Sequence, residues 1–282
     1  MKILLIAGHG HGDSGAVGCG YEESTLNREA LKYLKADLKE YNVDIKSYPT
    51  GRNCYEDLRN GTPYYNFSNF DCVIELHFNA YTASSNGTET LYRSSKSLAT
   101  KVDKAIAKVG FFDRGAKYRA DLQNMNVAYG LGVPYILIET CFITNKNDMK
   151  IYQYNKKKIW TNVAKAVASF YGLKKLKSKL TLVNANYPTE IKHGKPFIIT
   201  GKVNSNLELR SVVVVVEDYK TKKDVSYCTK KVGTHGYSYN LKNIDQYIQF
   251  KKLPVGTYRY KVKATDVTGR TKTLLSKKFK VI

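Results

Sequence analysis

Hydrophobic positions in the first 172 residues follow two alternating patterns. Short continuous apolar runs, such as KILLIAG at residues 2–8, are typical of buried strands, whereas apolar residues three and four positions apart are typical of helices. Strands separated by helices form βαβ units, and these predict an α/β domain with a mostly parallel sheet and helices on both faces. The predicted strands are residues 2–8, 43–49, 69–80, 88–93 and 134–140, and the predicted helices are residues 23–41, 95–110 and 145–172.

The pattern changes after Gly172. The basic run LKKLKSKL lacks apolar periodicity, and the segments beyond it are short, rich in β-branched and aromatic residues, and separated by turn residues. This pattern predicts a small all-β sandwich of the Ig-like or fibronectin-like kind. We therefore expect a catalytic domain at residues 1–174, a linker at 175–180 and the all-β domain at 181–282. The predicted strands of the second domain are residues 197–203, 211–219, 226–230, 236–241, 247–253, 257–266 and 274–282.

Charge is distributed unevenly between these two parts. The chain carries a net charge of +22. Residues 1–174 contain 23 Lys and Arg against 17 Asp and Glu, whereas residues 175–282 contain 23 against 7, so their net charges are +6 and +16. A field of that size attracts polyanions, which include nucleic acid, anionic lipid and the anionic polymers of a bacterial wall.

The cysteines and the N-terminus bear on the compartment. The five cysteines are an odd number without a CxxC pair, which argues against a disulfide framework and against a thiolate zinc cluster. The apolar run at residues 3–7 is much shorter than the roughly 18 to 20 residues that span a bilayer, and no small-residue cleavage site follows it. We expect no signal peptide, no membrane insertion, synthesis in the (host) cytoplasm and free thiols.

Polar residues at the ends of the predicted strands mark the candidate site, because ligands of an open parallel sheet gather beyond the carboxyl ends of its strands. His9 follows the first strand, His77 ends CVIELH, Glu139 ends YILIE, and Glu23 opens the first helix. Two imidazoles and one carboxylate suit a catalytic zinc ion, and the remaining carboxylate is then available as a general base. This reasoning leaves open the choice between His9 and the nearby His11, and between Glu23 and its neighbour Glu22.

Four stretches resemble the zinc-dependent N-acetylmuramoyl-L-alanine amidases of phage endolysins and bacterial autolysins. They are GHGHGDSGA at residues 8–16, ESTLN at 23–27, LHFNA at 76–80 and ETCFITNKND at 139–148. The resemblance spans about residues 1–172. It implies that His9, Glu23 and His77 bind Zn²⁺ and that Glu139 is the catalytic residue. It also implies substrate contacts, for which the candidates are His11, Asn79 and Arg114, the last of these in the short RGAK match at 114–117.

The resemblance predicts a peptidoglycan hydrolase that cleaves the amide bond between N-acetylmuramic acid and L-alanine, and the absence of a signal peptide favours a phage endolysin. The basic all-β domain is then expected to bind the anionic wall. Two alternatives are a zinc peptidase acting on the stem peptide and a nonenzymatic basic envelope-binding protein. A phosphate-binding loop at GHGHGDSG is disfavoured because no GK[ST] follows, and no RNP-like or zinc-knuckle motif indicates specific nucleic-acid binding.

Overall fold

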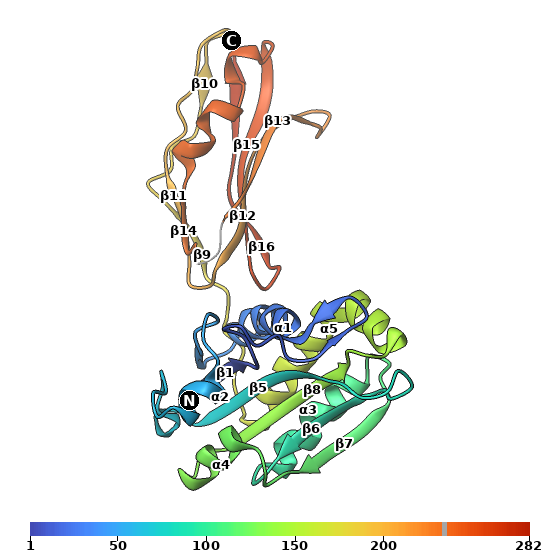
Figure 1. Ribbon diagram of the computed structural model, residues 1–282. Coiled ribbons are helices and arrows are strands. Elements are labelled where there is room, and N and C mark those ends of the chain that lie inside the picture. The colour runs from blue at the N-terminus through green and yellow to red at the C-terminus, as the bar shows by residue number, and fades with distance from the viewer. Residues whose placement is uncertain (233–235) are drawn as a thin grey trace. The chain divides into compact units, whose positions relative to one another are not determined.

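The computed structural model describes residues 1–232 and 236–282. The chain divides into two compact units, Met1–Leu176 and Lys177–Ile282, each with its own hydrophobic core. Figure 1 shows helices and a central sheet in the first unit and strands in the second. Within the described ranges, no helix combines the length and the apolar character that a membrane span requires.

The first unit is built on a six-stranded sheet in the order β4-β1-β5-β8-β6-β7 (Figure 1). Its pairings are parallel except for the antiparallel pair of β6 and β8, so the sheet is mixed and mostly parallel. The strands are β1 (Lys2–Ala7), β4 (Asp44–Ser47), β5 (Cys72–Asn79), β6 (Thr88–Tyr92), β7 (Asp113–Tyr118) and β8 (Tyr135–Phe142), and β2 (Val17–Gly18) and β3 (Tyr21–Glu22) form a separate hairpin.

Helices cover both faces of this sheet, as the pattern predicts. Side chains alternate between the two faces of a strand, so Ile3 and Leu5 of β1 pack into one apolar cluster while Leu4 and Ile6 pack into another. The first cluster includes α1, α3 and α5, and the second includes α2, α4 and a 3₁₀ turn. The helices are α1 (Glu23–Leu38), α2 (Cys54–Arg59), α3 (Lys96–Ala107), α4 (Gln123–Gly130) and α5 (Lys146–Phe170), and the 3₁₀ turn is η1 (Phe67–Asn69).

The second unit is built entirely from strands and 3₁₀ turns. A five-stranded sheet in the order β10-β16-β15-β12-β13 and a three-stranded sheet in the order β14-β11-β9 contribute side chains to one core. The elements are β9 (Leu180–Val183), β10 (Glu190–Ile191), β11 (Lys202–Ser205), β12 (Leu209–Asp218), β13 (Asp224–Lys231), β14 (Ser238–Asn240), η2 (Leu241–Tyr247), η3 (Phe250–Lys252), β15 (Gly256–Asp266) and β16 (Thr271–Val281).

Two predicted strands of this unit are corrected by the structure. Residues 247–253 lie in the 3₁₀ turns η2 and η3 and the loops beside them, not in a strand. The Asn240 side chain accepts a hydrogen bond from the Lys242 amide and caps η2, and the buried Leu241 and Ile244 lie three residues apart, as a helical turn requires. Of the predicted strand 197–203, only the end from Lys202 is in β11.

Candidate metal centre

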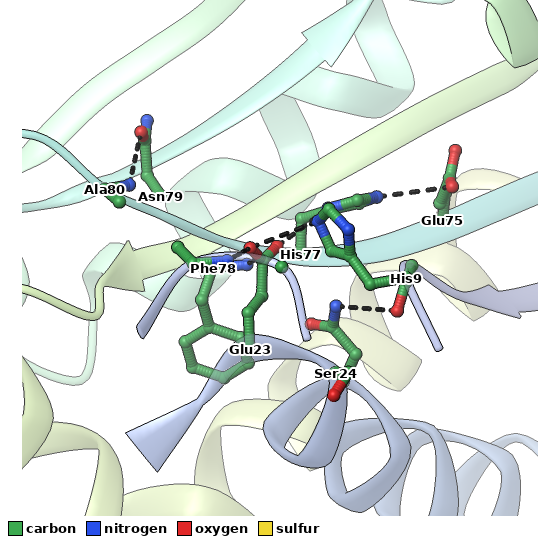
Figure 2. Close-up of polar contacts among 12 residues, drawn as sticks. His9, Glu23, Ser24, Glu75, His77, Phe78, Asn79 and Ala80 are labelled. Carbon is green, nitrogen blue, oxygen red and sulfur yellow. Dashed lines mark hydrogen bonds and ion pairs between the residues drawn. The ribbon is translucent and has the colours of Figure 1, made fainter. Parts of the chain in front are cut away.

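Three of the predicted site residues meet at the carboxyl edge of the sheet. His9 follows β1, Glu23 is the first residue of α1, and His77 lies near the end of β5. Because β1 and β5 are parallel neighbours, their carboxyl ends reach the same edge. One ligand atom from each side chain lies within 4.8 Å of the other two. Figure 2 shows the three side chains converging from these separate elements.

The Glu23 carboxylate lies between the two imidazoles. Its Oε2 atom is 3.2 Å from His9 Nε2, and its Oε1 atom is 2.8 Å from His77 Nδ1. The backbone amides of Ala16 and Phe78 each donate a hydrogen bond of 3.0 Å to the same carboxylate. Burial alone would raise the pKa of Glu23, but the hydrogen bonds and charges of the two histidines hold it well below its ordinary value. Glu23 is therefore an anionic donor, as a metal ligand must be.

Glycines allow this close approach. A Cβ atom at Gly8 would lie 2.2 Å from the His77 ring, and one at Gly15 would lie 2.6 Å from the His9 ring and 2.8 Å from Glu23. Such contacts are too short for any other residue. Gly8 and Gly15 of the GHGHGDSGA stretch thus leave room for the three candidate ligand side chains.

The loop that carries His9 is held by polar contacts from α1. His9 has a φ of 61° and Gly10 a φ of 103°, both in the left-handed region. The Asn27 amide donates to the carbonyl of Gly8, and the Arg28 guanidinium donates to the carbonyls of Gly8 and His9. These bonds fix an unfavourable backbone conformation, and this fixes the position of the imidazole.

The residues present fit a zinc ion. Two imidazole nitrogens and one carboxylate oxygen form a three-residue donor set of the kind that catalytic zinc sites use, with a fourth position left for water. The space left beside Gly8 and Gly15 and the anionic state of Glu23 agree with this donor set.

Glu139 lies beside this cluster on the neighbouring strand. It is the Cα partner of His77 in the pairing of β5 with β8. Its Oε2 atom is buried and has no hydrogen-bond partner among the residues that the structure describes. Burial raises the pKa of Glu139 to about 7, against the opposing effect of His77. A buried carboxyl group with an unused oxygen and a pKa near neutrality can accept and release a proton.

Comparison with known families gives a match along most of the first unit. The sequence profile of the Amidase_3 family, described as N-acetylmuramoyl-L-alanine amidase, matches residues 3–169. The chain belongs to this amidase family. The matched range contains His9, Glu23, His77 and Glu139, and it ends within α5.

Individual relatives of the family agree with the match. The chain is 31% identical over 154 residues to the N-acetylmuramoyl-L-alanine amidase LytC of Bacillus subtilis (strain 168), covering 52% of this chain and 30% of LytC. It is 30% identical over 188 residues to the endolysin of Bacillus phage SPP1, covering 61% and 67%. The crystal structure of N-acetylmuramoyl-L-alanine amidase from Clostridium difficile 630 superposes with a TM-score of 0.51 at 26% identity, covering 61% and 96%. The chain therefore spans less than a third of LytC.

The three other candidates, those for substrate contact, lie in two different settings. His11 is exposed on the loop after His9. Asn79 and Arg114 both contact Glu89: the Asn79 amide donates to Oε1 at 3.0 Å, and Arg114 Nε donates to Oε2 at 2.7 Å. Since Glu89 is the strand partner of Glu139, Asn79 and Arg114 are brought together on the β6 side of the site.

A cavity of about 530 Å³ lies beside the candidate metal centre. His9 and His77 line it together with residues of α2 and of the segment at the start of α4, which include Tyr55, Asp121 and Gln123. A space of this size and position suits part of a substrate whose reacting bond lies at the metal. Sequence reasoning missed this wall of the site, because its residues belong to short helices without a strong apolar pattern.

Sequence reasoning also missed two carboxylates. Each contacts the outer nitrogen of one histidine, which is the ring nitrogen that does not face Glu23. His9 Nδ1 is 2.8 Å from Asp13 Oδ2. His77 Nε2 is 3.2 Å from Glu75 Oε1 (Figure 2). The available signal for Glu75 was a single acidic residue in the apolar run CVIELH, two positions before His77 and therefore on the same strand face.

Proposed function

We propose that this chain is a zinc-dependent peptidoglycan hydrolase that cleaves the amide bond between N-acetylmuramic acid and the L-alanine of the stem peptide. The observation that carries the proposal is the His9, Glu23 and His77 cluster with Glu139 beside it, in a chain of the amidase family. The named activity of LytC supports the same bond.

His9, Glu23 and His77 would hold the metal. When bound there, Zn²⁺ polarises the scissile carbonyl and lowers the pKa of a coordinated water molecule towards neutrality. The chain itself supplies the position of this chemistry, because Asn27 and Arg28 fix the His9 loop and two backbone amides fix Glu23.

Glu139 would carry the proton. It removes a proton from the attacking water and delivers it to the nitrogen of L-alanine as the amide bond breaks. A pKa of about 7 suits both steps, since a general acid-base catalyst is most effective when its pKa lies near the working pH. The unpartnered Oε2 atom leaves one oxygen available for this transfer.

The second unit, as an Ig-like wall-binding domain, would hold the enzyme on anionic wall polymers. The support for this step is the net charge of +16 over residues 175–282. A phage origin would agree with the named endolysin relative, and the chain would then act on the wall as an endolysin does.

The test is digestion of purified cell walls, with new amines and new reducing ends measured in parallel. The proposal predicts new amino groups that belong to L-alanine, without new reducing ends, and loss of activity when a chelator removes zinc. New amino termini on other residues of the stem peptide would identify a zinc peptidase instead. Wall binding without any cleavage would identify a nonenzymatic envelope-binding protein.

A further inference from the structure

Glu75 is a buried carboxylate that the proposed reaction does not use. We propose that Glu75 is a positioning residue that accepts the Nε2 hydrogen of His77 and holds the ring with Nδ1 directed at Glu23 and His9. The inference rests on the proposed zinc site, and it adds a residue that determines how tightly that site binds its metal.

The first support is the geometry of the His77 ring. Its two nitrogens face two different carboxylates: Nδ1 is 2.8 Å from Glu23 Oε1 and Nε2 is 3.2 Å from Glu75 Oε1 (Figure 2). An imidazole that binds a metal through one nitrogen carries its hydrogen on the other, and an acceptor at that second nitrogen fixes both the tautomer and the ring orientation. Glu75 occupies that place.

The second support is that Glu75 is itself held rigidly. Its side chain is 6% exposed. The Asn124 amide from α4 donates to Oε1 at 3.2 Å, and the Tyr135 hydroxyl from β8 donates to Oε2. Both carboxylate oxygens therefore have partners from other elements, so the carboxylate cannot turn away from His77 without breaking them.

The third support is the position in the strand. The neighbours Ile74 and Leu76 are fully buried, and an apolar residue at 75 would avoid the free-energy penalty of burying a carboxylate. The charge at Glu75 is instead opposite the outer nitrogen of a predicted ligand. The contact of His9 with Asp13 repeats the arrangement at the other imidazole, but the Asp13 side chain is 47% exposed, so only the His77 contact is protected from water.

The experiment compares the full-length chain with its Glu75→Gln and Glu75→Ala variants. The probe is Zn²⁺ alone, titrated in competition with a chromophoric chelator, so that the Kd is measured without any activity assay. We expect Glu75→Ala to weaken zinc binding by about 10- to 100-fold, the usual effect of removing such a partner, and Glu75→Gln to retain part of the affinity because its amide oxygen can still accept the hydrogen. If the alanine variant does not fold, the zinc Kd of the glutamine variant is compared with that of the wild type instead.

Two further measurements separate positioning from fold stability. Nitrogen-15 NMR of the His77 ring in the zinc-loaded chain should show its hydrogen on Nε2 in the wild type and a mixture of tautomers in Glu75→Ala. The matched control is Asp148→Asn, which changes another buried carboxylate whose partners are the backbone amides of Gly87 and Phe142. This control should lower the melting temperature and leave the Kd for zinc unchanged.

The outcomes distinguish the inference from the proposal beneath it. Glu75 variants with the Kd and the His77 tautomer of the wild type would overturn the positioning role and leave the amidase proposal intact. Equal weakening of zinc binding in Asp148→Asn would assign the effect to stability and would also overturn it. A wild-type chain that binds no zinc would instead contradict the proposed function itself.

Discussion

The two units of the chain differ in the polar groups that they bury. Among the described residues, eleven of the thirteen buried polar or charged residues belong to the first unit, and four of these are acidic: Glu23, Glu75, Asp103 and Asp148. The second unit buries two, Glu217 and Asp266, and none of the described Lys and Arg of residues 175–282 is buried. The first unit therefore holds acidic groups of its candidate site in the interior, whereas the excess positive charge of the second lies outside its core.

Buried charges and exposed charges act over different distances. A buried charge loses its hydration and is tolerated only with fixed partners, so it acts at short range on a particular atom. An exposed charge acts over a distance of about 10 Å in 0.1 M salt and is screened as salt increases. The first unit should therefore respond to single substitutions and to metal, and the second to ionic strength.

The largest effect is expected from the three proposed ligands. His9→Ala, Glu23→Ala and His77→Ala should each lose zinc and abolish wall lysis, because a three-residue donor set does not survive the loss of one member. His11→Ala should keep its zinc, because His11 is exposed beyond the cluster. Zinc content and lysis rate measure the result. Loss of metal from His11→Ala together with retention in His9→Ala would reverse the assignment.

Glu139→Gln should have the next largest effect. The amide removes the proton carrier and no proposed ligand, so zinc should stay near one per chain while turnover falls by roughly 10² to 10⁴. Metal analysis and initial rates on walls test this pair of expectations. Loss of zinc from this variant would indicate that Glu139 is a metal ligand. Glu139 would then belong with the three proposed ligands and would not be a separate proton carrier.

Separating the units should have a smaller effect that depends on the substrate. The fragment 1–176 contains both apolar clusters of its sheet and every proposed catalytic residue. It should cleave soluble muramyl peptides about as fast as the full chain and intact walls more slowly.

Salt is the control for that comparison. Wall binding by the full chain should weaken between 0.1 and 1 M salt, as the screening length falls from about 10 to about 3 Å. Binding that persists in 1 M salt would indicate a specific carbohydrate pocket. A fragment that is as active as the full chain on intact walls would leave the second unit without an anchoring role.

Sequence reasoning succeeded where the local hydrophobic pattern of a segment matches its burial in the fold. The five strands and three helices predicted in the first unit are all present. A run such as KILLIAG is apolar on both faces, which favours a strand buried inside the sheet. His9, Glu23 and His77 are brought together because parallel strands align their carboxyl ends. Their roles, and that of Glu139, stay predictions.

Sequence reasoning failed where partners come from distant segments. The strand β7 lacks an apolar run and was not predicted. The helices α2 and α4 are too short for a clear helical period, so the cavity wall to which they contribute was not foreseen either. The role inferred for Glu75 depends on hydrogen bonds from Asn124 and Tyr135, which belong to other elements. Residues 247–253 resemble a strand because the buried Ile248 and Phe250 alternate with exposed residues, although the segment forms parts of two 3₁₀ turns.

The smallest expected effect concerns a buried carboxyl group of the first unit that lies outside the proposed chemistry. Asp103 of α3 is fully buried, and burial together with the nearby Asp113 carboxyl raises the pKa of Asp103 to about 8. The folded chain therefore holds a proton that the unfolded chain, with an ordinary pKa near 4, releases. Stability contributed by this group is present below about pH 4 and is lost progressively as the pH rises to about 8.

Asp103→Asn should remove that dependence, because the amide is neutral at every pH. We expect the variant to melt near the wild-type temperature at pH 4 and above it at pH 8, by about 2 to 4 °C for each ~1 kcal/mol recovered in a domain of this size. Calorimetry of the full chain across this range measures the difference, and Asp113→Asn should flatten the dependence in part by removing the neighbouring charge. A variant that is destabilised equally at all pH values would show that Asp103 acts as an ionised acceptor and would contradict this prediction.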